Sequence, residues 1–334
     1  MRALLNTAGE RVELSCDIGW LTAVLEEGAA GGLTAPGTSP PDVRVSVEAS
    51  TAAFGVAGWQ VLTRGAWQRA GQVVVTNACS SGLDLLVTVG EPTLDIVARW
   101  RPPVTVRGAT AVLRARARLL LRAVLLQYPA LWRSQLRGRA PLHASVCTAG
   151  GSRVVLLAGP GGAGKSTLVA GELASGAVAT CDNVCVSDGT TAWGLAEPLR
   201  MPSHLNASGG QGRRMPHGRR ETAWPGRAAS LVPGQLVVLA RGSDAAPSVA
   251  RCDPADAARS LAAGTYMAGE LRRYWPFAAT LALGTGAGDV HPAVQAVAAK
   301  LSSSLPCLRV TLASEPGAPL RELLGAVSEA GVSA

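Results

Sequence analysis

Nine consecutive residues of this chain combine the residue types that bind phosphate. Gly159 to Thr167 read Gly-Pro-Gly-Gly-Ala-Gly-Lys-Ser-Thr and match the pattern G-x-x-x-x-G-K-[ST] in full. Glycines let the backbone turn tightly, so that successive N–H groups surround phosphate oxygens, while the lysine adds a positive charge and the serine offers a hydroxyl to Mg²⁺. The expected nucleotide-binding residues are Gly159, Gly161, Gly162, Ala163, Gly164, Lys165, Ser166 and Thr167.

A carboxylate follows this loop closely in the sequence. Asp182 lies 17 positions after Lys165, within the apolar segment Ala177 to Val186. We expect Asp182 at the end of a strand beside the phosphate-loop strand, where an acid can reach a metal ion on the β- and γ-phosphates and can orient or deprotonate an acceptor hydroxyl. The alternative interpretation is an acid at a strand end that caps a turn.

The segments around the loop predict how it is positioned. Arg153 to Ala158 is typical of a buried strand, and Ser166 to Ala174 of a helix that Gly176 ends. Before them, Pro141 to Thr148 alternates and leads through Gly150-Gly151, which predicts a hairpin into the loop. After Asp182, the Asp188-Gly189 turn and a return strand at Thr191 to Leu195 predict a second hairpin.

The remaining carboxyl-terminal segments alternate between strands and helices. Arg200 to Arg227 is basic and includes Ser208 to Gly212, so it is either a lid or peptide-docking surface or a disordered insertion. The pattern further predicts strands at Gln235 to Ala240 and Leu308 to Leu312, and helices at Asp253 to Ala263, His291 to Ser303 and Pro319 to Val327.

The amino-terminal part is predicted to be rich in β-structure. A strand and a helix at Trp20 to Glu27 precede a loop at Gly31 to Pro41, and Val43 to Val106 alternates in twos, which favours an antiparallel sheet. Ala109 to Leu126 is a helix candidate that Pro129 ends or kinks. Its arginines 114, 118 and 122 either receive an acidic peptide or form a solvated face. Arg133 to Arg139 is interpreted as a connector between domains.

Length and composition limit the class of protein. With 334 residues, two domains are expected, and we place them at 1–138 and 139–334. The net charge of +8 suits an acidic ligand. The alternative is that it results from a genome whose base composition favours arginine codons. No nucleic-acid motif and no interleaved aromatic residues accompany this charge, so neither DNA nor RNA is an expected partner.

The cysteines and the hydropathy of the sequence predict the cellular compartment of the protein. Seven cysteines without metal-ligand spacing predict reduced thiols. Met1 to Cys16 contains Glu10 and Glu13 and lacks the apolar run of a signal peptide. Leu119 to Trp132 is interrupted by Arg122 and is too short to cross a bilayer. We expect a cytoplasmic protein with no membrane partner.

Leu142-His143-Ala144-Ser145, the loop from Gly159 to Thr167 and Asp182 together resemble the HPr kinase/phosphorylase family. The resemblance covers roughly residues 139–334, including Gly194 to Leu199 and the Leu305-Pro306-Cys307 strand, and is closest to the HPr-kinase-like proteins of the peptide-modifying branch. It implies an ATP-dependent serine kinase that uses Mg²⁺. The implied fold is α/β, a P-loop domain with the mixed sheet of HPr kinase and phosphoenolpyruvate carboxykinase, here preceded by a smaller β-rich α+β domain.

The resemblance also implies roles for single residues. His143 matches the family histidine near the transferred phosphate, and Asp182 matches the first of two paired aspartates. Asn183 stands at the second position, where its amide oxygen can bind Mg²⁺ but cannot accept a proton. The implied catalytic residues are Asp182, His143 and Lys165, and the implied metal ligands are Ser166, Asp182 and Asn183. Because the family often forms oligomers, a homo-oligomer is a possible assembly.

Three functions therefore stay open from the sequence. The first is a kinase that phosphorylates a serine or other hydroxyl of a peptide or small protein, such as a ribosomally made peptide precursor. The second is a small-molecule P-loop kinase, in which a helix rather than a hairpin usually follows the acid. The third is a nucleotide-binding regulator that transfers nothing, which Asn183 keeps open.

Overall fold

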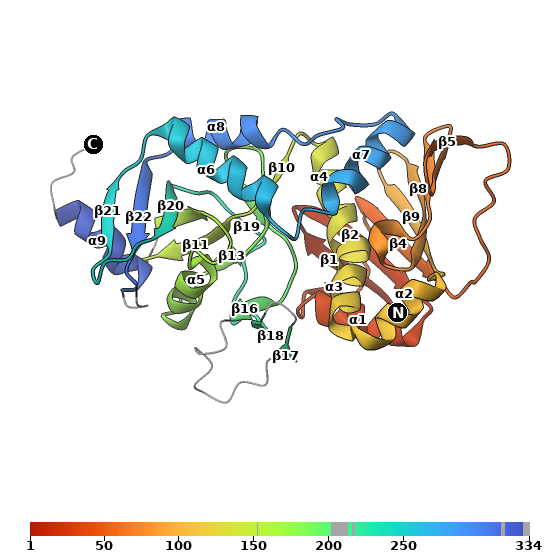
Figure 1. Cartoon of the computed structure of the whole chain (residues 1–334), viewed down its shortest axis with the longest axis horizontal. Coiled ribbons are helices and arrows are strands. Elements are labelled where there is room, and N and C mark those ends of the chain that lie inside the picture. Colours follow the sequence, from red (N-terminus) through yellow and green to blue (C-terminus); the bar gives the residue numbers. More distant parts are fainter. Residues whose placement is uncertain (152, 202–212, 216–217, 315–317, 330–334) are drawn as a thin grey trace.

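The computed structural model describes residues 1–151, 153–201, 213–215, 218–314 and 318–329. These residues form four β-sheets with helices packed on their faces, which confirms the mixed α/β class. The larger two sheets lie at opposite ends of the long axis, the amino-terminal sheet at the right and the phosphate-loop sheet at the left (Figure 1). The division into domains 1–138 and 139–334 stays a prediction.

The amino-terminal sheet has the strand order β3-β1-β2-β4-β9-β8-β7-β6-β5. The strands are β1 (Arg2–Thr7), β2 (Glu10–Cys16), β3 (Leu33–Thr34), β4 (Val43–Glu48), β5 (Gln60–Thr63), β6 (Ala66–Arg69), β7 (Gln72–Val75), β8 (Leu83–Val89) and β9 (Leu94–Trp100). The expected purely antiparallel sheet is wrong at β4, which pairs in parallel with both β2 and β9. For β2 the reason is the crossover that contains helix α1 (Gly19–Gly28) and returns the chain in the same direction. For β9 the reason is that the chain passes from β4 to β5 at the far edge of the sheet and returns to β9 through antiparallel neighbours.

Helices from both halves of the chain cover the apolar face of this sheet. Alternate strand residues such as Leu14, Val45 and Ile96 are buried against α1 and the long helical segment that follows β9. Helix α7 (Tyr274–Thr285) comes from the carboxyl-terminal half, yet its Phe277 and Leu281 belong to the same core. The two halves therefore share one hydrophobic cluster.

The predicted helix at Ala109 to Leu126 is longer and broken. It consists of α2 (Val104–Val112), α3 (Arg114–Arg122), a π-helical turn η2 (Ala123–Gln127) and α4 (Tyr128–Leu136). Leu113 breaks it with φ −103° and ψ 50°. Pro129 does not end it, because the proline lies in the first turn of α4, where its missing N–H is tolerated, directly after the π-helical turn. Arg133, predicted in a connector, is buried within α4.

The arginine stripe is not one solvated face. Arg118 pairs with Glu27 of α1 at 2.6 Å. Arg122 is buried, and its guanidinium pairs with Glu27 at 2.7 Å and with Glu221 at 2.7 Å. Only Arg114 is exposed among the three. The stripe therefore serves mainly to join α3 to α1 and to a strand near residue 221.

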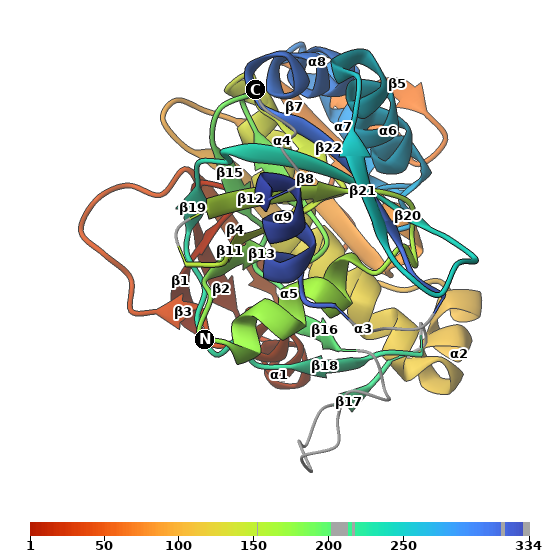
Figure 2. The same ribbon diagram turned by 90° about the vertical axis from the view of Figure 1, so that its left-hand side faces the viewer.

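The phosphate-loop sheet has the order β13-β11-β12-β20-β22-β21. Its strands are β11 (Ser145–Ala149), β12 (Arg153–Ala158), β13 (Ala179–Cys181), β20 (Gln235–Arg241), β21 (Ser248–Arg251) and β22 (Cys307–Leu312). β12, β20 and β22 are parallel, and the predicted hairpin joins β11 to β12. α6 (Pro254–Met267) and α8 (Val294–Ser304) cover one face, while α5 (Lys165–Ala174) and α9 (Leu320–Glu329) cover the other (Figure 2).

Two predicted strands each divide between two sheets. Pro141 to Thr148 forms β10 (Ala140–Leu142) and β11, and Ala177 to Val186 forms β13 and β14 (Cys185–Ser187). β10 and β14 pair within a second sheet of order β10-β14-β15-β19, with β15 (Ala192–Gly194) and β19 (Ser230–Leu231). The hairpin β14–β15 confirms the predicted return strand. The first segment passes from one sheet to the other at His143, between β10 and β11. The second does so at Asp182, between β13 and β14.

The position of β13 corrects one prediction. Asp182 does follow a strand, but β13 pairs with β11 and not with the phosphate-loop strand β12. β13, which was predicted beside β12, is therefore separated from β12 by one strand, β11. Asp182 still reaches the loop, because the chain leaves the sheet there to enter β14.

A three-stranded sheet lies between the two halves of the molecule (Figure 1). It contains β16 (Leu199–Met201), β17 (Arg213–Arg214) and β18 (Arg220–Thr222), with β18 in the centre. Part of the predicted basic loop, residues 202–212 and 216–217, which include Ser208 to Gly212, His204 and His217, lies outside the described residues. Within the described ranges, no helix combines the length and the apolar character needed to cross a membrane.

Candidate functional site

The loop from Gly159 to Gly164 adopts backbone angles that require glycine. Gly159, Gly162 and Gly164 have φ values of 148°, 83° and 111°. A Cβ on Gly159 would lie 2.7 Å from the carbonyl oxygen of Leu239, and one on Gly164 would lie 2.8 Å from Cδ1 of Leu312. Side chains at these two positions would therefore both strain the backbone and collide with β20 and β22.

Helix α5 begins directly after this loop without a capping side chain. Gly164 is its N-cap residue and makes no side-chain cap bond. The N–H groups of the first turn are thus left for another acceptor, and the positive end of the helix dipole favours an anion there. Ala163 is buried and Thr167 is half-buried, and neither lines the cavity described below.

Lys165 is folded back onto its own loop. Its Nζ donates to the carbonyl oxygens of Gly159 at 2.6 Å and Pro160 at 3.1 Å. The pKa of Lys165 is lowered to about 8, mainly by burial and also by the charge of Arg219, against the opposing charges of Glu270 and Asp182. The ammonium group therefore gains from an anion that would replace the two carbonyl oxygens.

Asp182 is 1% exposed and lies where the chain leaves β13. Its Oδ2 accepts from the backbone N–H of Arg200 at 3.0 Å. Its Oδ1 is buried without a hydrogen-bond partner among the described residues. Burial raises the pKa of Asp182, although the Arg200 and Arg219 charges act in the opposite direction. A buried carboxylate oxygen without a partner suits a cation or a proton donor that the chain itself does not supply.

The hydroxyl of Ser166 lies close to Asp182. Ser166 Oγ donates to the backbone carbonyl oxygen of Asp182 at 3.4 Å, and Ser145 Oγ donates to the same oxygen at 2.6 Å. Asn183 is also buried, and its Nδ2 lacks a hydrogen-bond partner among the described residues.

The donor set fits Mg²⁺ only together with a bound phosphate. Among the described residues, no group of three or more His, Cys, Asp or Glu side chains could hold a metal ion. Mg²⁺, however, is usually bound through one or two carboxylates plus phosphate oxygens and water, not by an all-protein cage. Ser166, Asp182 and Asn183 offer a hydroxyl, a carboxylate and an amide oxygen of this kind.

Arg219 places a positive charge next to these groups. Its Nη1 donates to Ser166 Oγ at 3.1 Å. The same charge acts on the carboxylate of Asp182 and on the ammonium group of Lys165. The sequence predicted Arg219 only as part of a basic segment, because a contact across 53 positions leaves no local pattern.

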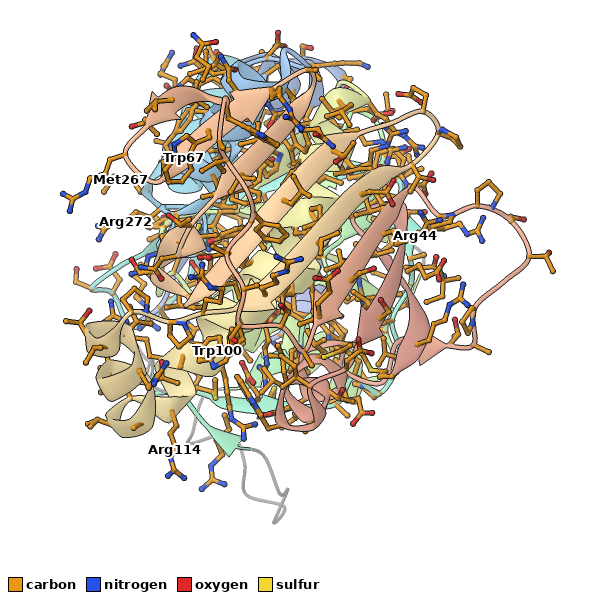
Figure 3. The ribbon with its side chains drawn as sticks, turned by 90° about the vertical axis from the view of Figure 1, so that its right-hand side faces the viewer. Arg44, Trp67, Trp100, Arg114, Met267 and Arg272 are labelled. Carbon is orange, nitrogen blue, oxygen red and sulfur yellow. The ribbon has the colours of Figure 1, made fainter. Side chains whose placement is uncertain are left out.

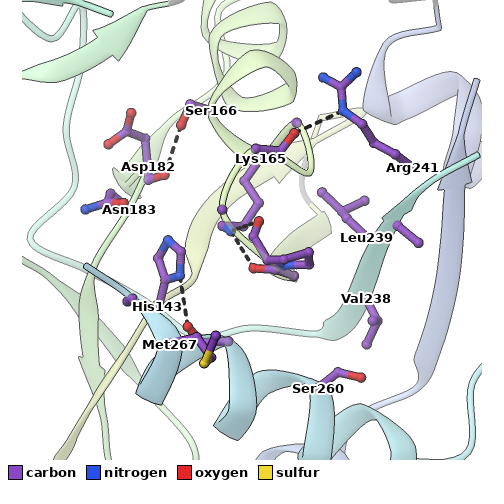
Figure 4. A pocket seen from close by; sticks show the side chains of 18 of the residues that line it. His143, Lys165, Ser166, Asp182, Asn183, Val238, Leu239, Arg241, Ser260 and Met267 are labelled. Atoms are coloured by element: carbon purple, nitrogen blue, oxygen red, sulfur yellow. Dashed lines mark hydrogen bonds between the residues drawn. The ribbon is translucent and has the colours of Figure 1, made fainter. Parts of the chain in front are cut away.

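His143 lies on the same side of the cavity as Asp182 and Asn183 (Figure 4). Its Nδ1 is 3.2 Å from the carbonyl oxygen of Gly264, and its backbone N–H donates to Thr265 at 3.0 Å. Burial lowers the pKa of His143 and the charge of Lys165 lowers it further. A neutral ring that donates through Nδ1 leaves the Nε2 lone pair as an acceptor.

Arg200 organises a second group of charges that the sequence patterns missed. Its guanidinium binds Glu197 at 2.9 Å and Glu270 at 2.5 Å, while its backbone N–H holds Asp182. Burial raises the pKa of Glu270, but the charge and hydrogen bond of Arg200, a backbone hydrogen bond and the charge of His143 together outweigh burial and lower that pKa to about 2. Burial raises the pKa of Glu197 to about 7 against the opposing charge of Arg200. Glu270 follows α6 without any motif, so no sequence signal pointed to it.

One cavity of about 750 Å³ brings these groups together. Lys165 lies between two sets of side chains: His143, Asp182 and Asn183 on one side, and Val238, Leu239 and Ser260 on the other (Figure 4). Arg241 also lines the cavity, and its Nε donates to the carbonyl oxygen of Gly162 at 3.0 Å. The volume is within the range of small-molecule sites, and the cationic lining residues suit an anionic ligand.

No protein-family model matches this chain, and no curated protein sequence matches it. The features that bear on function are therefore the geometry of the cavity and the sequence motifs.

Proposed function

We propose that this protein is an ATP-dependent kinase of the HPr-kinase-like type, which transfers the γ-phosphate to a serine or other hydroxyl of a peptide or small protein. A ribosomally made peptide precursor is one such acceptor. One observation carries the proposal. The uncapped N-terminus of α5, with Lys165, lines the same cavity as the buried Asp182, whose Oδ1 has no hydrogen-bond partner among the described residues.

Each group has a part in positioning the reactants. The N–H groups of residues 161–166 and the ammonium group of Lys165 hold the phosphates. Ser166, Asp182 and Asn183 would provide oxygen ligands for Mg²⁺, which when bound would neutralise charge on the nucleotide phosphates. Arg200 keeps Asp182 in place through its backbone N–H. Positioning and charge neutralisation supply most of the catalysis in phosphoryl transfer.

The transfer step uses Asp182 as the proton acceptor. The acceptor oxygen bonds to the γ-phosphorus, the bond from that phosphorus to the β,γ-bridging oxygen breaks, and ADP leaves. Asp182 orients the hydroxyl and takes its proton, which then passes to solvent. Glu270 is unsuited to this role because its pKa is about 2.

His143 fits the acceptor side of the reaction. A neutral imidazole with its Nδ1 proton directed at Gly264 cannot donate from Nε2 to a phosphate oxygen. Because the acceptor hydroxyl gives its single proton to Asp182, the Nε2 lone pair of His143 is left to accept a hydrogen bond from an N–H group of the acceptor peptide. We therefore propose that His143 helps to orient the acceptor and does not itself hold the phosphate.

Asn183 favours a second candidate, a nucleotide-binding regulator that transfers nothing. A buried amide stands where a second acid is expected, and its Nδ2 has no partner among the described residues. The small-molecule kinase has less support, because Asp182 is followed by the hairpin β14–β15 and not by a helix. The seven free cysteines support a proposed cytoplasmic location, and a homo-oligomer remains a proposal.

The test is phosphate transfer from labelled ATP. Wild-type protein with Mg²⁺, γ-labelled ATP and the peptides encoded beside its gene should label a serine or threonine. Lys165→Ala should lose nucleotide binding and labelling, whereas Asp182→Asn should keep nucleotide binding and lose labelling. Tight nucleotide binding with no labelled acceptor would replace the kinase by the regulator. Unchanged turnover in Asp182→Asn would remove Asp182 from the mechanism.

A further inference from the structure

Helix α2 contributes no buried side chain to any core. None of its residues from Val104 to Val112 is buried. Val104 and Val112 are 85% and 82% exposed, and the adjoining Leu113 is 50% exposed. Apolar side chains this exposed and this close together mark a surface that gains from a partner.

Arginines surround these apolar side chains. Arg107 of α2 and Arg114 and Arg116 of α3 are exposed, and no ion pair joins any of the three to another residue within the described ranges. Arg114 extends away from the ribbon into solvent (Figure 3). No Asp or Glu occurs in the sequence between Asp95 and Glu172, so this part of the chain supplies no opposite charge. We call Val104 to Arg116 the α2–α3 face.

The α2–α3 face is connected to the rim of the cavity. Arg122, at the end of α3, forms a buried ion pair with Glu221 of β18 at 2.7 Å. Arg219, two residues before Glu221 in the chain, contacts Ser166 in the cavity. The three-stranded sheet therefore lies between α3 and the phosphate loop, and a chain bound on the face can reach the cavity across β18.

We propose that the α2–α3 face docks an acidic, partly apolar segment of a peptide, and so holds a peptide substrate while its hydroxyl enters the cavity. The role as a substrate rests on the proposed function, but the binding itself does not. Exposed arginines select carboxylates, and the valines and leucine between them suit aliphatic side chains.

The composition of the face disfavours other anionic partners. Residues 101–127 contain no aromatic side chain on which a nucleic-acid base would stack. The exposed apolar residues are two valines and one leucine, without the Trp or Phe of a helix that inserts into a lipid surface.

The experiment measures binding to the full-length protein without ATP, by fluorescence anisotropy. The probe is a labelled peptide of alternating Glu and Leu, and its control carries Gln in place of Glu. The variant is Arg107→Glu/Arg114→Glu/Arg116→Glu. A matched control is Arg64→Glu/Arg153→Glu/Arg251→Glu, which makes the same charge change at exposed arginines elsewhere. A Val104→Ser/Val112→Ser variant tests the apolar contribution.

The acidic probe should bind the wild type and the matched control alike, and should lose about tenfold or more in affinity with the α2–α3 variant. The serine variant should lose affinity as well, and the Gln peptide should bind weakly to every protein. Lys165→Ala should keep full peptide binding, which separates this proposal from the kinase proposal.

Equal losses in the α2–α3 variant and the matched control would overturn the proposal, because net charge alone would then explain binding. So would failure of the acidic probe to bind the wild type. Single-stranded oligonucleotide and phosphatidylserine vesicles serve as competing probes. Tighter binding of either than of the peptide, lost in the α2–α3 variant, would assign the face to that partner instead.

Discussion

Nη1 of Arg219 donates a hydrogen bond to Oγ of Ser166 over 3.1 Å, so a guanidinium charge occupies the neighbourhood of the hydroxyl that a P-loop offers to Mg²⁺. The same charge acts on the carboxylate of Asp182. Because like charges repel, the guanidinium charge of Arg219 lowers the affinity of this position for a divalent cation.

Arg219→Gln should therefore strengthen Mg²⁺ binding. With ADP bound, the Mg²⁺ concentration that gives half-saturation should fall by about two- to fivefold in titration calorimetry. ADP is used because it lacks the γ-phosphate that Arg219 could contact. Arg220→Gln removes the same charge at the next position, the first residue of β18, and serves as the control. Equal effects of both substitutions would mean that Arg219 does not compete with the cation.

Nucleotide affinity should depend on pH through Lys165. The pKa of Lys165 is about 8 without ligand, and a bound phosphate favours the charged form, so binding above that pH requires uptake of a proton. The Mg·ADP association constant should be nearly constant below about pH 7.5 and fall toward tenfold per unit above about pH 8.5. Lys165→Arg should flatten this profile, because arginine stays charged. An identical slope in that variant would assign the dependence to another group.

Asn183→Asp should make the protein more dependent on metal. A second buried carboxylate beside Asp182 adds repulsion that a cation relieves. Without metal, Tm should fall by several degrees. With ADP present, the rise in Tm on adding Mg²⁺ should be largest in Asn183→Asp, intermediate in the wild type and smallest in Asp182→Asn. Equal Mg²⁺ effects in the three proteins would exclude both side chains as ligands.

Two glycines of the loop should respond differently to alanine. Gly159→Ala places a Cβ 2.7 Å from a backbone oxygen at φ 148°, and we expect a loss of about 1–3 kcal/mol in the free energy of unfolding. Gly161→Ala meets no atom within 4 Å and should stay within about 0.5 kcal/mol of the wild type. Urea unfolding measures both. Similar losses in the two variants would contradict the described loop geometry.

The ion pair between Arg122 and Glu221 should matter more than an exposed one. Arg122→Ala leaves Glu221 buried without its partner, and we expect a loss of about 3–5 kcal/mol in the free energy of unfolding. Arg44→Ala breaks the exposed pair with Asp95 and should lose about 1 kcal/mol or less. Arg122→Met/Glu221→Gln should recover much of the loss. A double variant no better than Arg122→Ala would show that lost packing, not an unpaired charge, causes the effect.

The sequence predicted the local parts of the site well and its long-range parts poorly. Strand β12, the glycine loop and helix α5 follow one another directly, so motif and periodicity were enough to predict them. The hairpins β11–β12 and β14–β15 have glycine turns and were also predicted correctly.

The errors concern contacts between distant segments. Two predicted strands are divided at His143 and Asp182, because their two halves join different sheets. The alternation of apolar and polar residues is the same in both sheets, so it could not predict this division. The parallel pairing of β4 depends on a crossover and not on the strand itself. Glu270 reaches Arg200 across 70 positions, which no local pattern records.

The most direct test of the proposed kinase follows the γ-phosphoryl group itself. ATP with ¹⁸O in the three non-bridging γ-oxygens is incubated with Mg²⁺, the protein and candidate peptides, and the products are examined by mass spectrometry. The kinase predicts a phosphopeptide whose phosphate keeps all three ¹⁸O atoms, formed in equal amount with ADP and absent with Asp182→Asn. Label found only in inorganic phosphate, or recovered unchanged in ATP that stays bound, would contradict transfer to a peptide hydroxyl.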